Sequence, residues 1–578
     1  MKFSILCTVF ISFFTSSIAQ PTPFEKSSGT ASATYFEAIK FFGQLDKASG
    51  KVQVKTMGAT DAGYPLHLVM VSANGNFDPV AWHKQNKAVV LILNGIHPGE
   101  PDGIDASMLL VRDIVKGTIK LPANVCLGII PVYNIGGSLN RGTSSRANQN
   151  GPVEYGFRGN SQNLDLNRDF TKNDSREAKS FAKIFHYLDP DIQVDNHVSD
   201  GADYQHTMTM LTTQPDKLGG DLGDWLKNKF EPSLYKSMSD KGWDMTPYVN
   251  FESADLSKGM DAFYDPPRYS SGYAALWQTI AFVPETHMLK PFKDRVLSTY
   301  AFMKTIIEES SSQVTSLKTL RAKLKVATSA QNSFPLSWEK DTTQYSLVTF
   351  KGYETGMKIS EATGLERMFY DHSKPNTRTI PFYNSFNGTQ IVTTPIYYII
   401  PQGWYAVTDL LQLNKVKMIK LKTDTTIDVQ SIKIAAYQSS PTPYEKHHRK
   451  SNVRFDTLKQ QVSFLKGDYL IPMNQRANRF IAEMLEPAGA DSYFAWNFFD
   501  GVLQQKEGYS DYRWEDVAAT VLQADTSLQQ LLLEKKKTDL EFSKDGSAQL
   551  NFIYKHSNYY EPGHMRYPVF KIVAAGTY

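Results

Sequence analysis

Two histidine-bearing turns carry the residue types of a metal site. His97 and Glu100 stand three residues apart in segment 94–101, and His197 lies in a second polar turn farther along the chain. Imidazole nitrogens and carboxylate oxygens are Zn²⁺ ligands, and a catalytic zinc ion needs three protein ligands and one open position. His97, Glu100 and His197 are therefore the candidate ligands. His206 lies near them in a strand-like run, where we expect a role in the core or as a partner of a metal ligand.

Two further segments carry charges suited to amide hydrolysis. Arg158 and the pair Asn167-Arg168 bracket an Asn-rich turn. Arginine forks bind carboxylates and donate hydrogen bonds to an oxyanion. Glu285 directly follows an apolar run, and a carboxylate at such a place beside a zinc-bound water takes its proton and passes it to a leaving amine.

An α/β alternation must position these residues. The run 89–93 is continuously apolar, which is typical of a strand buried on both faces by helices. Ligand sites in such sheets gather at the carboxyl ends of the strands, where both histidine turns lie. We expect a three-layer α/β/α domain with a mixed sheet. The predicted strands are 52–57, 66–72, 88–93, 125–132, 192–194 and 281–283, and the predicted helices are 35–47, 104–115, 175–187, 222–236 and 295–309.

The chain changes character after a Ser-rich break at 310–316. Strand-like runs then dominate, with a few helices, of which 474–485 and 514–537 have the clearest spacing. The strand-like runs are 345–350, 390–400, 415–422 and 431–437. We therefore predict a catalytic domain over residues 35–312 and a β-rich C-terminal region over 327–578, built as one or two subdomains.

Composition excludes several classes of protein. The 578 residues are 41% hydrophobic and 21% charged, which is a globular composition and not a disordered one. Lys and Arg number 62 against 59 Asp and Glu, a net charge of +3 that is too balanced for a nucleic-acid partner. After the first residues, no window reaches the ~20 uninterrupted apolar residues of a transmembrane helix. We expect neither a nucleic-acid partner nor a transmembrane segment.

The first residues predict export. Lys2 precedes a short apolar run, 3–14, and small residues at 17–19 predict a signal peptide of residues 1–19 that is cleaved after Ala19. Cys7 lies within this signal, so Cys126, in an apolar run, is the only cysteine of the mature chain. An exported chain without an intrachain disulfide indicates a bacterial periplasmic or secreted protein.

Taken in order, these segments resemble the zinc metallocarboxypeptidase family, the carboxypeptidase A-like or funnelin fold. The resemblance covers residues 35–312, and the C-terminal half is similar to the long extensions of bacterial exported members. It implies one zinc ion per chain, held by His97, Glu100 and His197, with Glu285 as the general acid and base that activates the zinc-bound water.

The resemblance also implies substrate contacts. Asn167 and Arg168 match the pair that grips the terminal carboxylate, and Asp165 matches the partner that orients the first histidine. Arg158 matches the arginine that stabilises the oxyanion, with Arg141 and Arg146 as competitors. The site tyrosine is Tyr264, Tyr269 or Tyr273, of which we take Tyr273.

The expected function is hydrolysis of C-terminal peptide bonds by an exported zinc carboxypeptidase. Its partners would be peptide or protein C-termini, peptidoglycan peptides among them. One alternative is an N-acyl amino acid amidohydrolase similar to aspartoacylase and succinylglutamate desuccinylase, which show a similar motif set. Another is a catalytically vestigial protein that binds peptide or glycan.

Overall fold

The chain folds into two compact units in the computed structural model, which describes residues 21–251 and 256–573. Unit 1 comprises Met1–Thr393, Asp409–Val416 and Asn474–Glu483, and unit 2 comprises Thr394–Thr408, Lys417–Met473 and Met484–Tyr578. Unit 1 thus extends past the expected division between residues 312 and 327. The predicted signal peptide, residues 1–19, lies outside the described residues.

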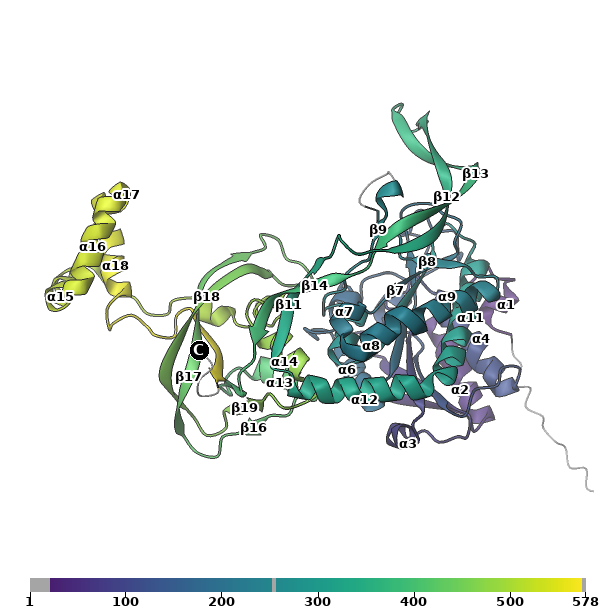
Figure 1. Ribbon diagram of the computed structural model, residues 1–578, viewed down its shortest axis with the longest axis horizontal. Helices are drawn as coiled ribbons and strands as arrows, with labels where there is room; N and C mark the ends of the chain where they lie inside the picture. The colour runs from purple at the N-terminus through teal and green to yellow at the C-terminus, as the bar shows by residue number, and fades with distance from the viewer. Residues whose placement is uncertain (1–20, 252–255, 574–578) are drawn as a thin grey trace, which may run out of the picture. The chain divides into compact units, whose positions relative to one another are not determined.

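A mixed sheet forms the centre of unit 1 (Figure 1). Its middle strands β4, β3, β5 and β10 run parallel to one another, whereas β2 joins β4, β1 joins β2 and β7 joins β10 in antiparallel pairs. The short strand β6 (His197–Ser199) also pairs with β10. The strand order is β1 (Val52–Ala59), β2 (Pro65–Ser72), β4 (Val125–Ile130), β3 (Ala88–Leu93), β5 (Ile192–Asp195), β10 (Ile280–His287), β7 (Met208–Thr212) and β8 (Met245–Pro247).

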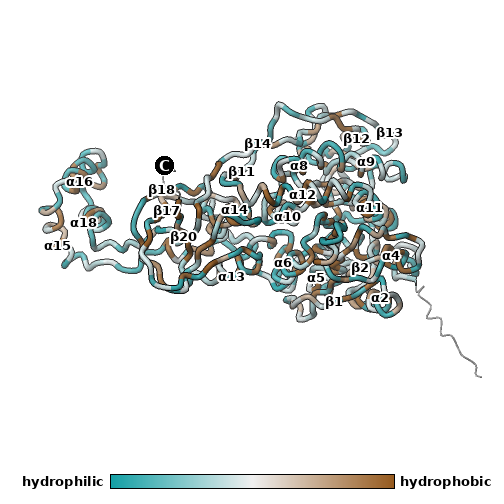
Figure 2. The backbone as a smooth tube through the Cα atoms, turned by 60° about the horizontal axis from the view of Figure 1, so that its bottom comes forward, coloured by the Kyte–Doolittle hydropathy of each residue, from teal (hydrophilic) through white to brown (hydrophobic). Residues whose placement is uncertain are grey.

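Helices cover both faces of this sheet, which confirms the predicted α/β architecture. Side chains that alternate along β3, such as Val90 and Ile92, share one core with α2 (Tyr35–Ala48), α4 (Asp102–Lys116) and α11 (Phe292–Ser312). On the opposite face, α6 (Arg176–Leu188) packs over β1, β2 and β3. Both faces of β3 are therefore buried, as its continuous apolar run predicts. Figure 2 shows brown, hydrophobic segments inside this unit and teal, hydrophilic segments along its outer loops.

Short helices complete unit 1 and its connections. A π-helical turn at Leu226–Phe230 interrupts the predicted helix 222–236 and separates α8 from α9. Its hydrogen bonds join residues five apart, whereas those of the two α-helices join residues four apart. The helices are α1 (Pro23–Lys26), α3 (Pro79–Lys84), α5 (Ile135–Leu139), α7 (Pro215–Leu218), α8 (Gly220–Trp225), α9 (Glu231–Asp240), α10 (Ser270–Leu276), α12 (Val314–Ala330), α13 (Tyr405–Leu413) and α14 (Asn478–Leu485).

Two strand pairs extend unit 1 beyond the central sheet. Strands β11 (Ser333–Lys340) and β14 (Phe386–Thr393) pair antiparallel. Between them in sequence, β12 (Ser346–Ile359) and β13 (Glu366–Tyr383) form a long antiparallel hairpin (Figure 1). Strand β13 also pairs in parallel with β9 (Met260–Asp261). The hairpin therefore belongs to the unit that carries the central sheet.

Unit 2 is built on a separate sheet, which confirms a β-rich C-terminal region with few helices. Its strand order is β16 (Ile419–Lys420), β19 (Tyr469–Pro472), β15 (Tyr397–Ile400), β20 (Arg566–Ile572), β17 (Thr425–Ser439) and β18 (Lys450–Phe464). The predicted helix 514–537 is two helices, because the Asp525 side chain accepts a hydrogen bond from Leu528 N and starts a new helix. The helices are α15 (Asp511–Ala524), α16 (Thr526–Thr538), α17 (Leu540–Lys544) and α18 (Gly546–Lys555). Among the described residues, no helix is long and apolar enough to cross a membrane.

Arg321 on α12 anchors that helix to the edge of the sheet opposite the histidine turns. The side chain is 1% exposed, and its guanidinium lies 2.9 Å from Asp191 Oδ1 and 2.7 Å from Asp189 Oδ1. Asp191 Oδ2 accepts a hydrogen bond from Val89 N, at the start of β3. Burial raises the pKa of Asp191, but the charges of Arg321 and Lys318 outweigh it and hold this pKa below its ordinary value.

Replacing Arg321 should therefore destabilise the fold. Arg321→Met leaves the buried carboxylate of Asp191 without its main partner and should lower the free energy of unfolding by about 3 kcal/mol. Lys323 lies on the same helix as Arg321 and makes an exposed pair with Asp221 of α8, so Lys323→Met should cost less than about 1 kcal/mol. Because the folded-state pKa of Asp191 is depressed, the ion pair stabilises above the unfolded pKa of about 4 and is lost as the pH falls further. Urea unfolding at pH 7 and pH 3 measures this; an equal loss at both pH values would contradict it.

Candidate active site

The carboxyl ends of neighbouring strands bring the candidate ligands together. β3 ends at Leu93 and leads into the turn that holds His97 and Glu100, while β6 begins with His197. In the ladder between β6 and β10, Glu285 is the direct register partner of His197. Residues far apart in sequence thus meet at one edge of the sheet.

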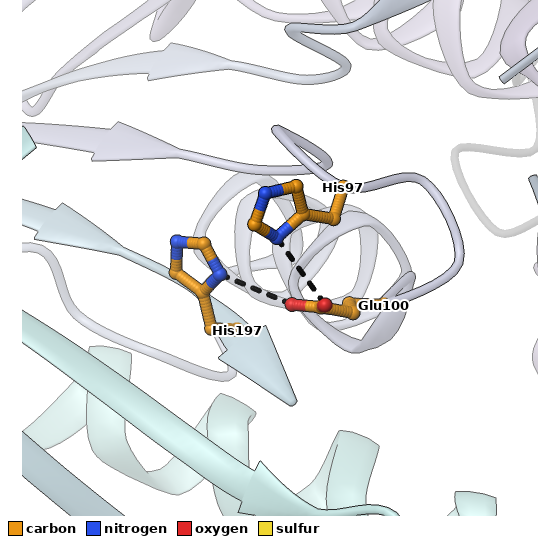
Figure 3. A group of neighbouring side chains, drawn as sticks. All are labelled: His97, Glu100 and His197. Atoms are coloured by element: carbon orange, nitrogen blue, oxygen red, sulfur yellow. Dashed lines mark hydrogen bonds and ion pairs between the residues drawn. The ribbon is translucent and has the colours of Figure 1, made fainter. Parts of the chain in front are cut away.

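His97, Glu100 and His197 converge on one point (Figure 3). His97 Nδ1 lies 3.2 Å from Glu100 Oε1, and His197 Nδ1 lies 3.0 Å from Glu100 Oε2. All three side chains are buried, and their donor atoms lie within 4.8 Å of one another. Two imidazole nitrogens and one carboxylate, facing each other, are a donor set suited to zinc.

Two aspartates hold the far nitrogens of these rings. His97 Nε2 lies 2.9 Å from Asp165 Oδ1, and His197 Nε2 lies 3.0 Å from Asp195 Oδ2. A carboxylate accepts hydrogen bonds, so an imidazole whose Nε2 donates to its aspartate presents Nδ1 toward Glu100, with a lone pair on Nδ1 when the ring is neutral. Lone pairs facing carboxylate oxygens repel unless a cation lies between them or the rings take up a second proton. Without a metal ion, Asp195 raises the pKa of His197 well above its ordinary value despite burial, which is the second of these outcomes.

The surrounding charge favours a cation as well. Glu285 is partly exposed and lines the pocket, and desolvation together with the nearby charges of Glu100 and Asp195 raises its pKa to about 8. His97 Nδ1 is buried and makes no hydrogen bond within the described part of the chain. Negative charge concentrated in a low-dielectric site is costly unless a positive ion offsets it. His97, Glu100 and His197 therefore fit a zinc ion.

Two of the three competing arginines face this site. Arg158 Nε lies 2.9 Å from Asp165 Oδ2, and the Arg158 side chain keeps 47% of its surface exposed. Arg146 Nη1 lies 2.9 Å from Glu100 Oε1, and Nη2 donates to Val198 O. Arg141 instead donates to Ser32 O and lies 3.8 Å from Glu154, outside the pocket. Arg158 is thus available to a substrate, while Arg146 supports Glu100.

Asn167 and Arg168 occupy a short 3₁₀ turn, Leu166–Arg168, at the wall of the same pocket. Arg168 donates from Nη1 to Asn167 O, and its guanidinium lies over the ring of Tyr269 at 4.1 Å. Asn167 Oδ1 accepts a hydrogen bond from Ser270 N. These contacts hold the guanidinium in a fixed plane, which is the requirement for bidentate recognition of a carboxylate.

The structure places Tyr273 outside the pocket. Helix α10 starts at Ser270 and buries Tyr273 against Phe181 and Phe185, and the Tyr273 hydroxyl donates to Asn414 Oδ1 at 2.6 Å. Tyr264 also lies elsewhere, against Phe386. Tyr269 is the tyrosine of the three that lines the pocket. Tyr269 precedes the first residue of α10 and faces the pocket, whereas Tyr273 lies within that helix and is buried.

Several pocket residues were not among the predicted site residues. The pocket has a volume of about 420 Å³, and Tyr248 and Asp265 line it. Asp195 orients His197. Its position two residues before this ligand in the sequence could have indicated that role. Nothing local to Tyr248 or Asp265 signals their position, since separate loops carry them to the pocket. His206, expected in the core, is 4% exposed and is not a ligand: its Nε2 accepts a hydrogen bond from Lys351 N.

Comparison with known proteins agrees with this geometry. Residues 39–212 match the model of a family described as zinc carboxypeptidase. This segment is similar to the zinc carboxypeptidase family and makes up about 30% of the chain. The predicted resemblance and the predicted enzyme class, a zinc metallocarboxypeptidase hydrolase, are confirmed.

Solved structures similar to part of this chain include bacterial and insect proteins. A metallo-carboxypeptidase from Burkholderia cenocepacia is 15% identical, with 49% of this chain and 70% of that chain covered and a TM-score of 0.36. Carboxypeptidase A from Helicoverpa armigera is 14% identical, covering 49% and 74% with a TM-score of 0.38. A metallo-carboxypeptidase from Pseudomonas aeruginosa is 12% identical, covering 50% and 70% with a TM-score of 0.37. Comparison with curated proteins gives no match.

The ligand set predicts a specific loss of metal. Purified parent protein should hold one zinc ion per chain, whereas His197→Ala should lose most of it, because two remaining ligands compete poorly for zinc. His448→Ala, at an exposed histidine of unit 2, should keep the parent stoichiometry. Elemental analysis after dialysis measures the ratio, and circular dichroism confirms folding. Undiminished zinc in folded His197→Ala would mean that another residue is the ligand.

Proposed function

We propose that the protein removes residues from the C-terminus of peptides by zinc-dependent hydrolysis. One observation carries the proposal: the fixed guanidinium of Arg168 lines the same pocket as the His-Glu-His cluster and Glu285. A pocket that anchors a carboxylate beside a hydrolytic centre selects the terminal peptide bond, since an internal bond lacks the free carboxylate.

The metal has a defined chemical role in this proposal. A zinc ion held by His97, Glu100 and His197 polarises a carbonyl group and lowers the pKa of a nearby water molecule. Asp165 and Asp195 keep the two imidazole rings oriented. Side chains of the protein carry out the proton transfer, stabilise the negative charge of the transition state and bind the substrate.

Three groups divide that work. Glu285 accepts a proton from the attacking water and delivers it to the nitrogen of the departing amino acid. Arg158, which is exposed to the pocket, donates hydrogen bonds to the oxygen that gains negative charge in the transition state. Arg168, with Asn167, binds the terminal carboxylate and so fixes the scissile bond between the other two groups.

We also propose an extracytoplasmic location. The support is the sequence pattern of residues 1–19 and the single cysteine, Cys126, that remains after it, which is buried within β4. Peptide C-termini outside the bacterial cytoplasm, including those of peptidoglycan peptides, are the proposed substrates.

Replacing Glu285 should separate chemistry from metal binding. Glu285→Gln keeps the shape of the side chain and removes the base, so kcat should fall by about 10²–10⁴ while zinc content stays at the parent level. Glu308→Gln, at an exposed glutamate of α11, should keep the parent kcat. Steady-state kinetics on a peptide with a free C-terminus gives both values. Near-parent turnover in Glu285→Gln would remove Glu285 from the mechanism.

The carboxylate anchor can be tested from both sides of the interaction. Lysine cannot reproduce the planar fork of arginine, so Arg168→Lys should lose at least about tenfold in kcat/KM on a free peptide. C-terminal amidation removes the other partner and should make a poor substrate for the parent enzyme. Because both changes break one shared interaction, their combined cost should be well below the sum of the two.

All four combinations of enzyme and substrate should be measured with the same peptide core. Arg176→Lys, at an exposed arginine 3.9 Å from Asp61, is the matched control and should behave as the parent. If the parent cleaves amidated and free peptides equally well, Arg168 does not anchor a terminal carboxylate. The function would then be endopeptidase activity or hydrolysis of a different amide.

A further inference from the structure

A second cavity lies between the β12–β13 hairpin and loops of the catalytic domain. Its volume is about 390 Å³, close to that of the active-site pocket. Tyr353 and Tyr370 contribute partly exposed rings from the two strands of the hairpin, and Val249 faces them from the domain side. Glu354 and Arg378 add a charged pair, 2.9 Å apart, to the wall. Aromatic rings with polar groups at the margin suit the side chains and backbone of a peptide.

The same two segments of the chain contribute neighbouring residues to both cavities. The loop after the third ligand lines the active-site pocket with Ser199 and Asp200 and then lines the second cavity with Ala202 and Asp203. Likewise, residue 248 lines the first cavity and residue 249 lines the second. Two residues of extended chain span at most about 7 Å, so the linings of the two cavities come within that distance of each other along both segments.

Contacts within unit 1 fix the hairpin to that shared loop. Gln205 N donates to Lys351 O at 2.9 Å, and the Gln205 side chain donates to Gly352 O at 2.7 Å. His372 Nε2 lies 2.6 Å from Asp203 Oδ2, and its ring stacks on Tyr353 with centroids 4.4 Å apart. His206 accepts from Lys351 N as described above. The β12–β13 hairpin is thus attached to the loop that follows the metal ligand His197.

The position of the carboxylate anchor gives the direction of the substrate. Arg168, Asn167 and Tyr269 line only the first cavity, and the second cavity receives no residue from their segments. The lining of the first cavity comes next to that of the second at Ser199 and Asp200, which follow the metal ligand His197, and at Tyr248. A peptide whose terminal carboxylate is bound at Arg168 therefore has its preceding residues directed toward the second cavity.

We propose that the cavity between the β12–β13 hairpin and the 199–203 loop binds the substrate residues that precede the cleaved bond, with a preference for aromatic and aliphatic side chains. This inference rests on the proposed carboxypeptidase function. It assigns a role to a hairpin that lies outside the segment matched by the family model, residues 39–212. The expected substrates are accordingly extended peptides of several residues rather than dipeptides.

A length series on the parent enzyme tests the proposal without any variant. Peptides of two to eight residues that share their C-terminal residues should show kcat/KM rising by at least about tenfold once they reach the second cavity, the gain expected from burying an aromatic contact. The rise should be larger with Leu or Tyr at the added positions than with Gly. A flat series would overturn the inference.

A variant then assigns the gain to the hairpin. In the double substitution Tyr353→Ala/Tyr370→Ala, the ratio of kcat/KM for the octapeptide to that for the dipeptide should fall at least about tenfold toward one. Leu365→Ala, at an exposed residue of the same hairpin, should keep the parent ratio. A parent-like ratio in a double variant that still cleaves the dipeptide would also overturn the inference.

A binding measurement covers the case in which the double variant loses activity. In the Glu285→Gln background, a fluorescent octapeptide should bind more weakly when both tyrosines are replaced, and anisotropy measures the loss. Equal binding would count against the second cavity. The two proposals fail in different ways: a parent enzyme that cleaves no peptide contradicts the proposed function, whereas cleavage that does not depend on length contradicts only the second cavity.

Discussion

Buried negative charge is the constraint on which the site depends. Glu100, Glu285 and Asp195 lie close together at the carboxyl ends of β3, β10 and β5, and desolvation opposes the ionisation of Glu100 and Glu285 there. Positively charged groups must therefore lie close to these carboxylates to offset their charge. Arg146 lies 2.9 Å from Glu100, and Arg158 lies 2.9 Å from Asp165, which in turn contacts His97. The geometry of the two imidazole rings leaves room for one more cation at their centre.

The part of this arrangement that follows from local sequence was predictable. The apolar run of β3 identifies a strand buried on both faces, and the turn after it carries His97 and Glu100. His197 and Glu285 likewise follow short apolar runs, and parallel strands place their carboxyl ends at one edge. Fold class and the convergence of these four residues therefore follow from pattern and strand geometry. Asp165 also contacts His97 as the family resemblance implied.

The part that depends on distant segments was not predictable. Tyr269 and Tyr273 differ by four residues, and only the exact start of α10 decides that Tyr269 faces the pocket while Tyr273 is buried. The segments Asp409–Val416 and Asn474–Glu483 return to unit 1 from within the C-terminal half, and no local composition marks them. The β12–β13 hairpin contacts Gln205 and His206, so its position likewise depends on tertiary contacts that sequence periodicity does not reveal.

The central claim is that a metal ion offsets the charge at Glu100 and is bound through the Nδ1 atoms of both histidines. A crystal structure of zinc-loaded protein, with an anomalous difference map at the zinc edge, tests it most directly. We predict one peak about 2.0–2.2 Å from Nδ1 of His97, Nδ1 of His197 and a carboxylate oxygen of Glu100, with Asp165 and Asp195 still on the two Nε2 atoms. A peak at other residues, or coordination through Nε2, would contradict the account.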